Sequence, residues 1–164
     1  MLAEQEKKNT LEMNLDTFLR QKKQQQPPIE WENKKQKWLL SVNELYATIE
    51  DWLSHLTNDH IVKMSYNTIT LDEYYLKPYP VKQLNLLVGY ESVQFEPKGM
   101  IVVNALGRVD MIGDDGILKL LLRSDDETNN LQWVVAVSTV HSLWFPLTKA
   151  SFSEALEQVM RKNV

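Results

Sequence analysis

The first apolar pattern in the chain has a helical period and predicts a helix over residues 10–25. Its apolar residues are spaced at i, i+4, i+7 and i+8 and form one stripe on a polar cylinder: Leu11, Leu15, Phe18 and Leu19. Pro27 and Pro28 follow, and proline disfavours helical backbone in the residue before it. The first helix is therefore expected to end before residue 27. Pro28 can begin the next helix, where its missing N–H costs nothing.

A second helix is predicted over residues 28–56 by a longer and wider pattern. Spacings of 3, 4, 3, 4 and 3 join one set of apolar residues: Leu39, Val42, Tyr46, Ile49, Leu53 and Leu56. A neighbouring line at intervals of seven consists of Trp31, Trp38, Leu45 and Trp52. An apolar face of this width favours burial against a sheet or several helices over a narrow two-stranded seam.

From about residue 61 the apolar period changes to two or to short apolar runs, which are typical of strands. Short connections rich in Gly, Asp and Asn separate these runs, and Asp115-Gly116 is the clearest turn. Helix-length connections are missing from this region, so the strands are expected to be antiparallel. We expect strands at 61–66, 68–76, 81–88, 91–96, 100–104, 108–112, 117–123 and 131–138, with a possible last strand at 140–145.

The last segment predicts a helix over about 152–162. Ser151 and Glu154 have the spacing of a capping box, and a helical apolar face follows them. The fold class is therefore α+β, with an antiparallel meander of six to eight strands. One face of the sheet would be covered by the second helix and the C-terminal helix. Residues 1–27 are interpreted as an N-terminal helical arm, and residues 28–164 as a single α+β domain.

Composition and charge narrow the classes of protein. The chain has 164 residues, of which 43% are hydrophobic and 24% charged, and it has no cysteine. A disulfide framework and thiolate chemistry are thus excluded, which suits a reducing compartment. The N-terminus has no apolar signal segment, and no apolar run approaches the ~20 residues of a membrane span, so we expect a cytoplasmic protein. Residues 1–37 carry eight Lys/Arg against six Asp/Glu, whereas the formal net charge of the whole chain is −4.

Candidate chemistry is sparse. His55, His60 and His141 lack the spacing of a zinc site, and the serines and glycines form neither a nucleophile elbow nor a phosphate loop. The acidic pairs lie at expected turns or strand ends, where carboxylates are usually solvated. We therefore expect no metal, no cofactor and no catalytic residue, and the question of enzymatic activity stays open, with the motifs leaning against it.

Arg108 and Asp110 lie two apart in an expected strand, so both side chains point to the same face. An exposed ion pair of this kind contributes less than about 1 kcal/mol to stability. The alternative is a polar anchor that binds a partner's charge. Arg108 and Asp110 are thus a secondary polar site.

Three functional hypotheses remain. The first is a non-catalytic protein-interaction module that self-associates or docks a protein partner through five anchors: Leu11, Leu15, Phe18, Trp31 and Trp38. The protein's own sheet could cover the first helix equally well, because a short helix is marginal alone in water. The second is a small-ligand or enzymatic pocket between sheet and long helix, lined by aromatic residues: Tyr74, Tyr75, Tyr79, Tyr90, Trp133, His141 and Trp144.

The third and weakest hypothesis is single-stranded nucleic-acid binding. Trp31 and Trp38 could stack on bases beside basic residues that contact phosphates: Arg20, Lys22, Lys23, Lys34, Lys35 and Lys37. The negative net charge and the intervening Glu30 and Glu32 disfavour this interpretation. No membrane partner is expected.

Overall fold

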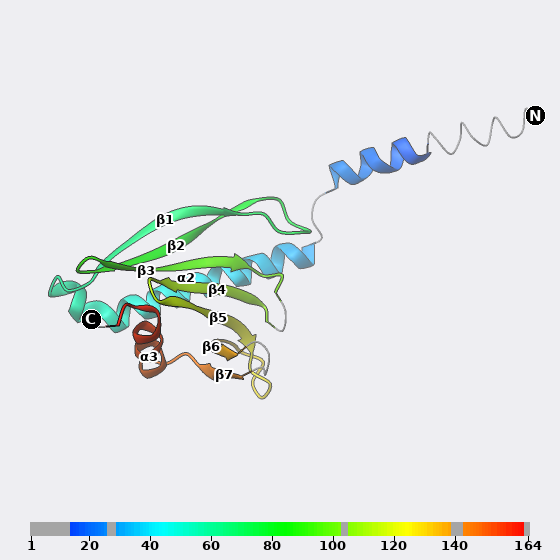
Figure 1. Cartoon of the computed structure of the whole chain (residues 1–164). Coiled ribbons are helices and arrows are strands. Elements are labelled where there is room, and N and C mark those ends of the chain that lie inside the picture. Colours follow the sequence, from blue (N-terminus) through cyan, green and yellow to red (C-terminus); the bar gives the residue numbers. More distant parts are fainter. Residues whose placement is uncertain (1–13, 26–28, 103–104, 139–142, 163–164) are drawn as a thin grey trace, which may run out of the picture.

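A long helix, a meander of seven strands and a short C-terminal helix form the body of the protein. The computed structural model describes residues 14–25, 29–102, 105–138 and 143–162. A helix over residues 14–24 comes first (Figure 1). The elements that follow it are α2 (Ile29–Asn58), β1 (Lys63–Leu71), β2 (Tyr79–Val88), β3 (Glu91–Gly99), β4 (Gly107–Gly113), β5 (Gly116–Ser124), β6 (Leu131–Ser138), β7 (Leu143–Pro146) and α3 (Lys149–Val159).

The seven strands form one antiparallel sheet in the order β1-β2-β3-β4-β5-β6-β7. Each strand therefore pairs with its neighbours in sequence, as hairpin chemistry at the turns predicts. The predicted α+β fold with six to eight strands is confirmed. The proposed boundary between an arm at 1–27 and a domain at 28–164 stays a prediction.

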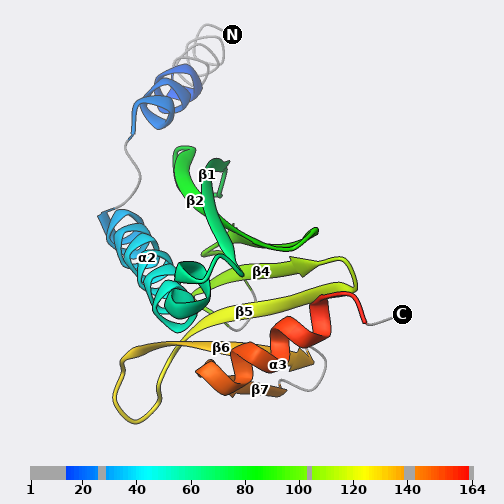
Figure 2. The same ribbon diagram turned by 90° about the vertical axis from the view of Figure 1, so that its left-hand side faces the viewer.

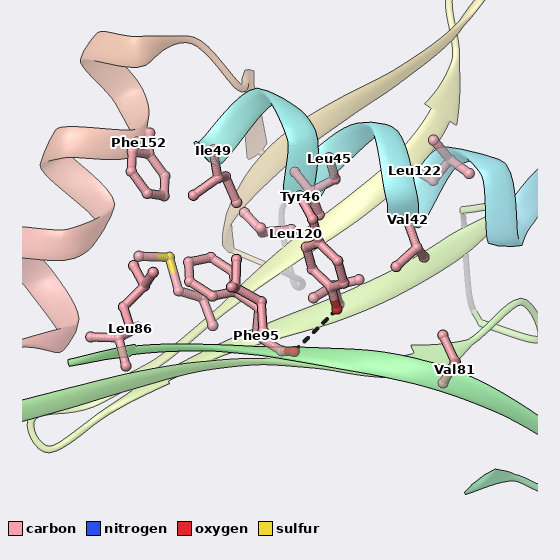
Figure 3. Close-up of a cluster of buried hydrophobic side chains, with 14 of the residues drawn as sticks. Val42, Leu45, Tyr46, Ile49, Val81, Leu86, Phe95, Leu120, Leu122 and Phe152 are labelled. Atoms are coloured by element: carbon pink, nitrogen blue, oxygen red, sulfur yellow. Dashed lines mark hydrogen bonds between the residues drawn. The ribbon is translucent and has the colours of Figure 1, made fainter. Parts of the chain in front are cut away.

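Both α2 and α3 pack against the same face of the sheet, and the core lies between them and the strands (Figures 2 and 3). Phe152 of α3 lies 5.3 Å from Trp52 of α2 and 6.2 Å from Phe95 of β3, measured between ring centroids. The side chains of Ile49 and Leu120 are fully buried in the same cluster. The apolar face predicted for the second helix is therefore the face that the sheet covers.

The side chains of Tyr46 and Trp133 form hydrogen bonds that join α2 to the sheet. The Tyr46 hydroxyl donates to the carbonyl oxygen of Lys82 over 2.7 Å and lies 3.3 Å from that of Phe95. The indole Nε1–H of Trp133 on β6 donates to the carbonyl oxygen of Ser41 over 3.1 Å. Burial raises the pKa of Tyr46 well above its ordinary value, so this hydroxyl stays protonated and keeps donating.

The predicted elements differ from the structure in three places. The expected strands at 61–66 and 68–76 are one strand, β1. The C-terminal helix begins at Lys149, one turn before the predicted start, because Thr148 and Ser151 form the capping box. The Thr148 hydroxyl accepts a hydrogen bond from the Ser151 N–H over 3.1 Å, and the Ser151 hydroxyl accepts one from the Thr148 N–H over 2.8 Å.

The predicted strand at 100–104 is wrong in its described part, residues 100–102. The Glu73 carboxylate accepts hydrogen bonds from the backbone N–H groups of Met100, over 2.6 Å, and Ile101, over 3.0 Å. These N–H groups are therefore not available for a strand ladder. Glu73 also accepts a hydrogen bond from the Tyr79 hydroxyl, so it joins the β1–β2 connection, strand β2 and the segment after β3.

Candidate functional site

The N-terminal helix (residues 14–24) lies away from the body in both views (Figures 1 and 2). Its apolar residues Leu15, Phe18 and Leu19 are 59%, 53% and 55% exposed. Lys22 lies one turn after Phe18, and its Nζ is 5.7 Å from the centre of the Phe18 ring. Leu11, the other predicted member of the stripe, lies outside the described residues. The described part of the stripe is therefore not covered by the protein's own sheet.

A groove of about 730 Å³ lies beside the first part of α2, the element that follows the N-terminal helix in the chain. Three segments form its walls: the first part of α2, the connection between β3 and β4, and the end of the β5–β6 loop. We call this the groove. It is lined by Trp31, Lys34, Lys37, Trp38, Met100, Ile101, Val102, Ala105, Leu106, Leu122, Asn129, Asn130 and Leu131.

Trp31 and Trp38 occupy different positions in the groove. Trp31 is half-buried; it stacks on Tyr75 with ring centroids 5.1 Å apart, and the Lys34 Nζ lies 4.5 Å from its ring centre. Trp38 is 1% exposed and lies 6.0 Å from Trp133, between the sheet and α2. Of the two tryptophans predicted as partner anchors, only Trp31 offers an accessible surface, and Trp38 is part of the core beneath the groove.

Tyr75 is held against Trp31 in an uncommon backbone conformation. Its φ is +69°, in the left-handed region that costs a non-glycine residue about 1 kcal/mol or more. Tyr74 meets the Tyr75 ring edge-on at 4.6 Å and is mostly exposed. The two tyrosines thus extend the aromatic rim of the groove from Trp31 onto the β1–β2 connection.

Glu73 stabilises the wall of the groove opposite α2. Its hydrogen bonds hold the backbone of Met100 and Ile101, which line the groove. Burial raises the pKa of Tyr79 well above its ordinary value, and the hydrogen bond to Glu73 raises it further. The Tyr79 hydroxyl therefore remains a donor to Glu73 at physiological pH.

The charges around the groove are arranged by side. Lys34 and Lys37 stand on the α2 side. On the other side, the lining residues Asn129 and Asn130 end the β5–β6 loop, which carries Asp125, Asp126 and Glu127. We call these three residues the acidic loop. The groove therefore has two lysines on its α2 wall, and the wall that Asn129 and Asn130 form adjoins the acidic loop.

Arg108 and Asp110 lie on the other face of the sheet and are not part of the groove. The Arg108 Nε–H and an Nη2–H donate to the two Asp110 oxygens over 2.6 and 2.8 Å, and these bonds raise the Arg108 pKa. The predicted shared face is confirmed, but the expectation of a solvated acid is wrong, because Asp110 is only 4% exposed. Asp110 belongs to the middle strand of a seven-stranded sheet, where neighbouring strands shield it.

The aromatic residues predicted to line one pocket do not converge. Tyr79 is buried, Tyr90 is fully exposed at the β2–β3 turn, and Trp144 lies on β7, where the Arg123 guanidinium is 5.0 Å from its ring centre. His141 lies outside the described residues. Within the described part of the chain, no cluster of three His, Asp or Glu side chains could hold a metal ion. Among the helices of that part, none combines the length and apolar character of a membrane span.

The groove could not be predicted from the sequence, because its walls come from three segments that are far apart in the chain. Met100, Ile101 and Leu106 belong to an apolar run that resembles an ordinary strand. Comparison of the chain with protein-family models, curated proteins and solved structures finds no match. Function therefore has to be inferred from the geometry of this chain.

Proposed function

We propose that the protein is a non-catalytic interaction module that binds protein through its N-terminal helix. The supporting observation is the exposure of Leu15, Phe18 and Leu19 on a helix that its own body leaves uncovered. The helix described over residues 14–24 is short, and a short helix is only marginally stable alone in water. It therefore gains stability when a partner covers its apolar face. Helices of this kind dock into apolar grooves through residues at i, i+3 and i+4.

The exposed fractions of Leu15 and Phe18 indicate how much these side chains contribute to binding. Complete burial of a Leu or Phe side chain contributes about 1.5–3 kcal/mol, and about half of each side chain remains to be buried. Leu15 and Phe18 together then contribute about 2 kcal/mol to each docked helix. The double substitution Leu15→Gln/Phe18→Gln should weaken binding by about thirty-fold.

Photo-crosslinking in the cells that make the protein tests this function. A photoreactive amino acid replaces Phe18 in one full-length chain and Thr17 in another. Both positions are exposed, but they lie about 100° apart around the helix and only position 18 is on the stripe. Crosslinks to a protein, including a second copy, are expected from position 18 and not from position 17. Equal crosslinking from both positions, or crosslinks only within the chain, would refute the proposal.

A small-ligand function is the second candidate, because the volume of the groove falls in the range of about 300–1,000 Å³ that is typical of ligand sites. Lys34 and Lys37 would select a ligand that carries a carboxylate or phosphate. Ligand-observed NMR with small aromatic acids tests this, and Ile101→Glu should abolish the signal changes. The nucleic-acid alternative is less well supported, because the Trp31 ring is already stacked on Tyr75 and Trp38 is buried.

A further inference from the structure

The N-terminal helix and the groove of this protein are complementary to each other. Building on the proposed function, we propose that the N-terminal helix of one copy docks in the groove of a second copy, so that two copies exchange their helices reciprocally. The partner is then another molecule of this same chain. Each dimer contains two identical helix–groove contacts related by a two-fold axis.

The N-terminal helix and the groove both expose apolar side chains. The helix offers Leu15, Phe18 and Leu19 in one stripe, each more than half exposed. The groove offers Ile101 and Leu106, each 47% exposed, together with Leu131 at 40%. Apolar side chains that remain exposed on both surfaces gain free energy when they cover each other.

The charged side chains of the N-terminal helix are also complementary to those around the groove. Asp16 lies in the first half of the described helix, and Arg20, Lys22 and Lys23 lie in the second half. A helix that crosses the groove from α2 to the β5–β6 loop would have Asp16 at the end beside Lys34 and Lys37 and its basic half at the end beside the acidic loop. The Arg20–Asp16 pair within the helix is 3.6 Å long and exposed on both sides, so it contributes little and can be exchanged for these contacts.

A second copy is favoured over the same copy by the link between the helices. The N-terminal helix ends at residue 24, α2 begins at Ile29, and Trp31 already lines the groove. Four Cα–Cα steps join residue 25 to Ile29, which is at most about 14 Å of chain, so the helix could reach its own groove only by folding back at once over the start of α2. The helix accordingly leads away from the body (Figures 1 and 2).

The experiment uses the full chain and measures the dimerisation constant by sedimentation velocity. The helix variant is Leu15→Gln/Phe18→Gln, and its control is Thr17→Gln on another face of the helix. The groove variant is Ile101→Glu, and its control is Ile117→Glu, at an isoleucine that is 59% exposed on β5 and outside the groove. Leu106→Glu is a second groove variant, in case Ile101→Glu disturbs folding. Both disruptive variants should weaken dimerisation at least tenfold, and both controls should leave it within twofold.

Mixing the two disruptive variants tests the reciprocal exchange directly. The helix variant keeps an intact groove and the groove variant keeps an intact helix, so a 1:1 mixture should form a heterodimer with one intact contact. Because the chain has no cysteine, a Tyr90→Cys substitution at the fully exposed β2–β3 turn provides a single labelling site for each variant. Fluorescence transfer should therefore appear in the mixture and not in either variant alone.

Two outcomes separate this inference from the proposed function. If the groove variant dimerises like the unaltered chain while the helix variant does not, the helix binds another surface; the inference is overturned and the proposed function stands. If position 18 crosslinks only to a different protein and the full chain is monomeric at every concentration, the second copy is excluded as the partner. If neither variant changes association and position 18 yields no protein crosslink, both proposals fail.

Discussion

Replacement of Gly107 by alanine tests how tightly the body is packed beneath the groove. A Cβ atom at position 107 would lie closer than 3.0 Å to the Trp38 ring atoms Cζ3 and Cε3 and 3.3 Å from Cη2. Trp38 is 1% exposed and lies against Trp133, so its ring can give way toward the groove but not toward Trp133. Overpacking of this kind costs typically about 1–3 kcal/mol.

The expected effect is a loss of about 2 kcal/mol in the free energy of unfolding. For a chain of this length, each kcal/mol shifts the melting temperature by about 2–4 °C, so Tm should fall by about 4–8 °C. Urea unfolding followed by tryptophan fluorescence gives the free energy, and differential scanning calorimetry gives Tm. The same variant should also alter the groove, because the Trp38 ring that it displaces is one of the lining residues.

Gly116→Ala is the matched control. Gly116 begins β5 as Gly107 begins β4, but no heavy atom lies within 4 Å of a Cβ built there, and its φ is not in the left-handed region. Alanine at position 116 should be neutral or should stabilise the protein by up to about 1 kcal/mol, because it restricts the unfolded chain. Equal stabilities of the two variants would show that Trp38 has room to move and would refute the packing argument.

Three further predictions concern stability. Burial raises the pKa of Tyr46 and Tyr79 above their ordinary value of 10. Their contribution to stability is therefore complete below pH 10 and is lost above it, because the unfolded chain releases these protons first. Urea unfolding should give nearly the same free energy at pH 8 and 9 and a fall of about 1 kcal/mol for each tyrosine between pH 10 and 11, and equal free energies at pH 9 and 11 would contradict it. Thr148→Ala should cost about 1 kcal/mol in urea unfolding by removing the cap of α3, whereas Thr148→Ser should keep most of it. Glu73→Ala should speed amide hydrogen exchange at Met100 and Ile101, because both N–H groups lose their acceptor. Glu73→Gln should speed it less, because the Oε1 acceptor remains. Similar exchange rates in both variants would argue that Glu73 does not support the groove wall formed by Met100 and Ile101.

The fold could be predicted to the extent that local pattern determines it. The stripe of α2 is long, and its wide face matches its burial by the sheet, so both the type and the extent of this helix were predicted nearly correctly. Each strand is linked to the next by seven residues or fewer, and neighbour pairing then follows from chain connectivity. The sequence of residues 100–104 has the local character of a strand, and only a carboxylate from 27 positions earlier in the chain reveals that it is not one.

The candidate site could be predicted only in its helical half. The stripe of the N-terminal helix is a local pattern, whereas the groove depends on three segments whose proximity no pattern records. Trp31 and Trp38 occupy equivalent heptad positions, yet one is at the rim and the other in the core, because only the later turns of α2 lie over the sheet. The burial of Asp110 could not be predicted for the same reason. An acidic side chain is usually expected to be exposed to solvent, whereas Asp110 is shielded by the strands on either side.

The hydrogen bond from Trp133 to Ser41 has a consequence for synthesis of the protein. Its two partners are 92 positions apart, and at roughly 5–20 residues per second Trp133 is joined to the growing chain about 5 to 18 s after Ser41. During that interval the early hairpins can form, because each needs only its neighbour, but the part of α2 around Ser41 has no β6 to pack against. A ribosome-bound chain that ends before β6 should therefore expose the tryptophan-rich face of α2 and be a preferred client of chaperones.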